Sequence, residues 1–170
     1  MTSPLQKILI NSYKDQMIIF MKEHPEYFNE AIELAVSDNQ PYAWRSAWLL
    51  WSCMKEDDER VKNKLEDIIS AIDGKKDGHQ RELLKILLKM ELAGDQEGRL
   101  FSISVDIWEK TSKNPSVRFT AFQFVLKIAK KYPDLLNEIE FFMQDHYVES
   151  LSPGIRRSVL RALGELRGDA

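Results

Sequence analysis

The chain has 170 residues, a length that suits one domain and allows roughly 70% of the unfolded surface to be buried. Hydrophobic residues make up 44% of the chain and charged residues 30%, a composition that excludes an intrinsically disordered protein. The longest strictly apolar runs, such as 17–21, are five residues and exclude a membrane-spanning segment, and the net charge of −3 argues against a general binder of nucleic-acid backbones.

We expect a cytoplasmic protein. Residues 1–16 do not follow the pattern of a signal peptide, because Lys7 and several polar residues interrupt the apolar positions. The single cysteine, Cys53, excludes an internal disulfide and fits a reducing compartment.

Apolar positions recur with a period of 3.6 residues and no segment alternates with a period of two, so only helices are predicted. In chain order they span 4–23, 26–36, 41–54, 58–72, 78–92, 97–111, 115–131, 133–146 and 153–167. The first either runs unbroken or breaks near 11–12. All six prolines stand at or just before a helix start, where a fixed φ and a missing N–H are tolerated.

The helices after the first group into four pairs, each with a helix A followed by a helix B. We predict a single domain over 1–170, with a cap at 1–24 and repeats at about 25–55, 56–93, 95–131 and 132–168. Segment 24–35 resembles segment 132–143, and their prolines are 108 residues apart, which is three periods of 36. Self-similarity at such a period is typical of stacked helical repeats.

Four arginines near the starts of the B helices mark the same period. They are Arg45, Arg81, Arg118 and Arg156, separated by 36, 37 and 38 residues. Good N-cap residues stand four positions before the last three, namely Asp77, Asn114 and Ser152.

The pattern of a turn, a cap residue, a hydrophobic residue, an arginine and a later apolar residue resembles the HEAT-like repeat. It reads NPSVRFTA at 114–121 and SPGIRRSV at 152–159, and less closely DGHQRELL at 77–84 and QPYAWRSA at 40–47. The resemblance implies an all-α fold, an α-α superhelix or right-handed solenoid, with the arginines inside the stack and the B helices on the concave surface. It also implies a scaffold or adaptor. The chain is similar to small bacterial HEAT-like proteins of unassigned role and, more distantly, to DNA alkylation-repair glycosylases.

The arginines have a functional and a structural interpretation. Guanidinium groups one repeat apart match a phosphate backbone or an acidic peptide. Alternatively, each satisfies carbonyls or acidic side chains at the turn between repeats, and this interpretation is favoured because the surrounding charge is not basic. Arg156, Arg157 and Arg161 are then the best candidates for an exposed basic edge.

Trp44, Trp48 and Trp51 follow the spacing i, i+4, i+7 and share one face of a helix. If exposed, they form a platform for a peptide or for stacked bases. If buried, they are the apolar seam against neighbouring pairs. The core interpretation is favoured, and whether one ring reaches solvent is left open.

No catalytic constellation, metal site or cofactor site is predicted. The acidic run 56–59 is interpreted as a solvated helix start, and His24, His79 and His146 lack the spacing of zinc ligands. We therefore expect a non-enzymatic scaffold, monomer or homodimer, that binds a protein or peptide through its B helices. The candidate binding residues are Trp44, Trp48, Arg45, Arg81, Arg118, Arg156, Arg157 and Arg161. The alternatives are a DNA-interacting protein, disfavoured by a pI near 5.7, and a homo-oligomeric structural protein.

Overall fold

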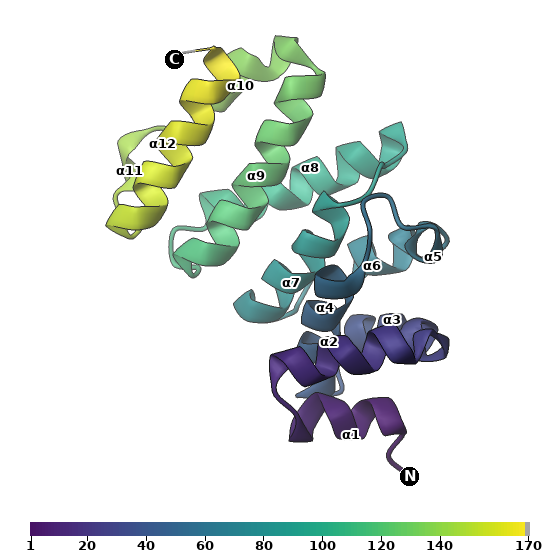
Figure 1. Ribbon diagram of the computed structural model, residues 1–170. Coiled ribbons are helices and arrows are strands. Elements are labelled where there is room, and N and C mark those ends of the chain that lie inside the picture. The colour runs from purple at the N-terminus through teal and green to yellow at the C-terminus, as the bar shows by residue number, and fades with distance from the viewer. Residues whose placement is uncertain (169–170) are drawn as a thin grey trace. The chain divides into compact units, whose positions relative to one another are not determined.

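The computed structural model describes residues 1–168, and within that range all regular structure is helical, as predicted (Figure 1). The helices gather into two compact units, Met1–Leu92 and the part of the chain from Ala93 onward. Each unit is described by itself.

In the first unit, α4 is the central helix. The elements of this unit are α1 (Pro4–Asn11), α2 (Lys14–Glu23), the 3-10 helix η1 (Pro25–Tyr27), α3 (Phe28–Val36), α4 (Tyr42–Cys53), α5 (Glu59–Lys62), α6 (Leu65–Ala71) and α7 (Asp77–Leu88). Helix α4 packs against α1, α2, α3 and α7. Its side chains Ala43, Ala47, Leu49 and Leu50 have no exposed surface, and full burial of a leucine stabilises the fold by roughly 1.5–3 kcal/mol.

The packing within the first unit has the form of stacked helix pairs. Helix α3 pairs with α4 and α6 pairs with α7, while α3 also contacts α6 and α4 contacts α7. Like helices therefore lie beside like helices in successive repeats, which is how a solenoid covers an apolar face that one pair cannot bury alone.

In the second unit, α9 takes the central place, between α8 and α12 (Figure 1). The elements are α8 (Gly94–Glu109), α9 (Pro115–Lys131), the 3-10 helix η2 (Pro133–Leu135), α10 (Leu136–Phe141), α11 (Asp145–Val148) and α12 (Pro153–Arg167). Trp108 stacks on Phe122 with ring centroids 4.4 Å apart, and both side chains are fully buried. This aromatic pair ties α8 to α9.

The break near 11–12 that the sequence left open is present, and two further predicted helices are interrupted. The segment 4–23 forms α1 and α2, because the chain is extended at Ser12 and Tyr13, where the Gln16 side chain accepts from the Tyr13 N–H and starts a new helix. Segment 58–72 forms α5 and α6 with a break at Asn63 and Lys64. Segment 133–146 forms η2, α10 and the first residues of α11.

The start of α5 corrects the interpretation of the acidic run. Asp58 is its N-cap, only 6% exposed, and accepts from the backbone N–H groups of Lys55 and Arg60. The Arg60 guanidinium also pairs with it at 2.8 Å, and these bonds hold the pKa of the Asp58 carboxyl well below its usual range. The helix-start interpretation is confirmed, but this carboxylate is buried, not solvated.

The predicted bounds of α9 and α12 agree with the structure, and Asn114 and Ser152 cap them through side-chain oxygens. Asp77 is not the N-cap of α7, because Lys76 holds that position and Asp77 is the first helical residue. The internal match is confirmed, since Pro25 opens η1 and Pro133 opens η2. Over residues 1–168, no helix has both the length and the apolar character needed to cross a bilayer.

Candidate binding site

The three tryptophans of α4 differ in exposure along the helix. Trp44, in the first turn, is 39% exposed. Trp48 and Trp51 are half-buried and meet edge to face with ring centroids 6.1 Å apart. The Trp51 indole N–H donates to Glu82 of α7. The stripe is thus tied to the stack at its C-terminal end and open to solvent at its N-terminal end.

Each of these rings lies close to a cationic side chain. The pairs, measured from the charged group to the ring centroid, are Arg45 with Trp44 at 5.5 Å, Lys14 with Trp48 at 5.0 Å and Lys85 with Trp51 at 4.5 Å. Separations below about 6 Å are typical of cation–π attraction. The aromatic face of α4 therefore carries positive charge.

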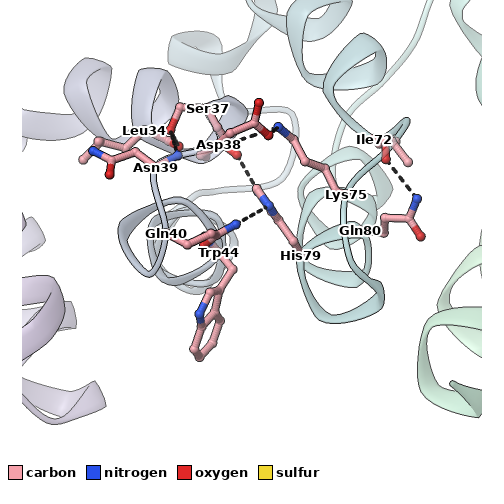
Figure 2. Close-up of polar contacts among 11 residues, drawn as sticks. Leu34, Ser37, Asp38, Asn39, Gln40, Trp44, Ile72, Lys75, His79 and Gln80 are labelled. Carbon is pink, nitrogen blue, oxygen red and sulfur yellow. Dashed lines mark hydrogen bonds and ion pairs between the residues drawn. The ribbon is translucent and has the colours of Figure 1, made fainter.

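A pocket of about 620 Å³ opens beside Trp44. It lies between the turn 37–41, which joins α3 to α4, and the turn 72–76, which joins α6 to α7 (Figure 2). Its walls include Gln40, Trp44, Lys75, Lys76, His79 and Arg81. Gly74 supplies the left-handed backbone of the second turn, with φ of +77°, a conformation that other residues rarely adopt.

Trp44 also lines a second pocket, of about 160 Å³, whose walls include Tyr13, Lys14, Arg45 and Trp48. Tyr13 is 84% exposed. The two pockets therefore share one residue, Trp44, at the start of α4.

His79 connects three elements at the floor of the larger pocket (Figure 2). Its Nε2 lies 2.7 Å from the Ala35 carbonyl oxygen of α3 and its Nδ1 lies 3.0 Å from the Gln40 side-chain nitrogen. Because a carbonyl only accepts, Nε2 carries the proton and Nδ1 accepts from the Gln40 amide. Burial lowers the pKa of His79, so the neutral imidazole is the form that fits.

Gln40, which bonds to His79, also bonds to Trp44. Its side-chain oxygen accepts from the Trp44 backbone N–H at 3.2 Å, which satisfies one of the donors that a helix start leaves open. The first turn of α4 is thereby fixed to α7 through His79.

Lys75, in the turn 72–76, bonds to two residues of the turn 37–41 (Figure 2). Its ammonium donates to the Ser37 carbonyl at 3.1 Å and pairs with Asp38. The hydrogen bond from Lys75 lowers the pKa of the Asp38 carboxyl, so this carboxylate stays ionised at neutral pH.

Three of the four repeated arginines bond to carbonyls at the C-terminal ends of other helices. Arg45 donates to Leu9 of α1 at 2.5 Å, and Arg156 donates to Val148 and Glu149 at the end of α11. Arg118, with no exposed surface, donates to Trp108 at the end of α8. The final carbonyls of a helix lack partners within it and carry partial negative charge. The structural interpretation is confirmed for these three.

The remaining arginines are placed differently. Arg81 pairs with Glu82 at 3.0 Å and lines the larger pocket together with Trp44. Arg157 and Arg161 are exposed on α12, as is Arg156. The structure thus brings Trp44, Trp48, Arg45 and Arg81 together in the first unit, whereas Arg118, Arg156, Arg157 and Arg161 belong to the second.

The chain has a counterpart among known families. The HEAT repeat domain family matches the chain over residues 1–165. The chain belongs to this family. No curated protein and no solved structure matches it.

HEAT repeats are generally scaffolds for protein interaction and are typically not enzymes. Across residues 1–168, no group of three or more histidine, cysteine, aspartate or glutamate side chains has a geometry that could hold a metal ion. Around α4, this HEAT repeat protein presents an aromatic wall, hydrogen-bonding side chains and cationic groups.

Sequence reasoning missed Gln40, Lys75, Lys76 and His79. A signal was present, because Gln40 and His79 are 39 residues apart, close to the repeat length, and stacking places equivalent turns side by side. The sequence did not show that the side chains of these turns point at one another.

Proposed function

We propose that this HEAT repeat protein is a non-enzymatic cytoplasmic scaffold or adaptor that binds a protein or peptide partner through the first unit. The binding surface comprises the two pockets that share Trp44, with Trp48, Arg45 and Arg81 beside it. One observation carries the proposal: a tryptophan on a B helix is 39% exposed and forms a wall of both pockets.

Trp44 has the properties of a binding anchor. Tryptophan is enriched at the centres of protein interfaces, since it offers a large, rigid contact area at low entropic cost. The bond from its backbone N–H to Gln40 fixes the start of α4, so little ordering is required when a partner binds.

A DNA-interacting role has less support. The larger pocket includes the carboxylate of Asp38, and the overall charge of −3 opposes a polyanion. The oligomeric state, monomer or homodimer, remains a prediction.

The proposal is tested by panning a displayed library of random peptides against the full chain, then measuring how selected peptides bind to variants. Trp44→Ala is expected to weaken binding by about tenfold or more, the range of an interface hot spot. Lys130→Ala, an exposed change in the last turn of α9 in the second unit, is the control and should leave affinity unchanged.

Tyr13→Ala provides a second variant that cannot disturb the core, since Tyr13 is 84% exposed and lines the smaller pocket. Peptides that bind Trp44→Ala and Tyr13→Ala as tightly as the unaltered chain would show that the binding surface lies elsewhere. A library that yields no enriched peptide would contradict the peptide-binding function itself.

A further inference from the structure

The larger pocket has a charge opposite to that of the chain. Its lining contains three cationic side chains, Lys75, Lys76 and Arg81, and one carboxylate, Asp38; with Glu82, which pairs with Arg81, one positive charge remains in excess. The whole chain has a net charge of −3. A cavity with a local positive excess in an acidic protein selects for a ligand of negative charge.

The cationic groups of the pocket differ in how they are held. Lys75 is engaged by Ser37 and Asp38, and its side chain is only 10% exposed. Lys76 is exposed at the rim, and Arg81 is partly exposed while paired with Glu82. Lys76 and Arg81 therefore face solvent where a ligand would enter, whereas Lys75 fixes the turn.

The adjoining surface extends the same chemistry. Arg45 lies over the ring of Trp44 and Lys14 lies over the ring of Trp48, both beside the smaller pocket. An anionic group close to these cations would gain attraction, and an apolar group would contact the indoles. The cationic and the aromatic contacts both lie around the first turns of α4, at Trp44 and Trp48.

We infer that the ligand of this surface is an acidic peptide, in which a bulky apolar side chain contacts Trp44 and flanking aspartate or glutamate residues pair with Lys76 and Arg81. The inference rests on the proposed function and adds the class of partner. The peptide carboxylates complement the local charge, and the apolar side chain fills a pocket that is too large for ions alone.

A nucleic acid fits these observations less well. A strand needs positive charge that continues along its length, whereas Asp38 borders this pocket and Asp15 lies in the first turn of α2. A short acidic peptide requires only two cationic contacts and one aromatic wall.

The test uses fluorescence anisotropy with the full chain and labelled peptide pools of about twelve residues, long enough for an extended segment to cross both pockets. Each pool has a central Phe, Leu or Trp. The flanking positions hold Asp and Glu in the first pool, Asn and Gln in the second, and Lys and Arg in the third. A labelled single-stranded DNA of similar length is the fourth probe.

We expect the acidic pool to bind about tenfold more tightly than the neutral pool, and the basic pool and the DNA to bind more weakly still. Lys76→Glu should weaken the acidic pool by about tenfold, and Lys76→Ala by about threefold. The matched control is Lys55→Glu, an exposed change of the same kind beyond the far end of α4, which lies about 14 Å from Trp44 by helix rise. It should change nothing.

The outcomes separate the inference from the proposed function. If the neutral or basic pool binds as well as the acidic one and still depends on Trp44, the acidic class is wrong and the peptide-binding function stands. Tighter binding of the DNA, with the same dependence on Lys76, overturns the inference in favour of a nucleic acid. If no peptide pool binds, both proposals fail.

Discussion

Arg118 places a positive charge in the interior of the second unit. Its guanidinium donates to the Trp108 carbonyl, the Tyr147 carbonyl and the Ser150 hydroxyl at 2.9, 2.6 and 2.9 Å, and it lies 4.7 Å from the Trp108 ring centroid. Burial lowers the pKa of Arg118, yet an arginine keeps its proton at any physiological pH. The buried charge of Arg118 is therefore stabilised by those three acceptors.

Replacing Arg118 by methionine should lower the free energy of unfolding by about 3 kcal/mol or more, since buried acceptors lose their donor. Arg118→Lys keeps the charge but loses the planar fork, and should have an intermediate effect. Urea unfolding measures both. Arg157→Met, on the surface of α12, should change stability by less than about 0.5 kcal/mol. A loss below about 1 kcal/mol for Arg118→Met would contradict the stabilising role.

His79 makes the first unit sensitive to mild acid. Burial lowers the pKa of His79 in the folded chain. Near and below pH 6.5, the ordinary value, the unfolded chain therefore binds more protons than the folded one, and the free energy of unfolding decreases as the pH decreases. Lys75, Asp38 and Glu82 are the charged groups that act on His79.

We predict that the melting temperature of the unaltered chain falls between about pH 7.5 and 5.5, and falls less in His79→Gln, which cannot acquire this charge. Thermal unfolding followed by circular dichroism over this range provides the comparison. Equal slopes for the two proteins would show that protonation of His79 does not oppose folding.

At the scale of helices, the sequence predicted those with strong end signals best. Asn114 followed by Pro115 gave the start of α9, and Ser152 followed by Pro153 gave the start of α12. Breaks inside a periodic segment were harder to predict. Val61 and Leu65 keep helical spacing and are both buried, yet α5 ends before Asn63. Tertiary packing holds both side chains whether or not the helix continues between them.

The candidate site was predicted only in part. The spacing of Trp44, Trp48 and Trp51 gave the shared face, but exposure depends on what packs against that face, and α7 covers Trp51 through Glu82 while Trp44 stays open. The pocket was not predicted, because it is formed by turns from two repeats whose side chains have no periodic pattern.

On the scale of the whole molecule, we predict that residues 1–170 behave as a single domain. In repeat proteins each repeat is stabilised by its neighbours, so the units should unfold together. Circular dichroism reports all helices, while tryptophan fluorescence is dominated by Trp44, Trp48 and Trp51 of the first unit. Both probes should give one midpoint in urea. Separate midpoints would show that the two units are independent domains.

The bonds from His79 to Ala35 and Gln40 make the larger pocket a composite of two successive repeats, so its shape exists only while those repeats are stacked. Occupancy and stacking are therefore thermodynamically linked. A ligand at about one hundred times its dissociation constant would add about 2.7 kcal/mol to the cohesion of that junction. A bound partner would therefore stabilise the stacking of these two repeats, and their junction would be most rigid in the bound state.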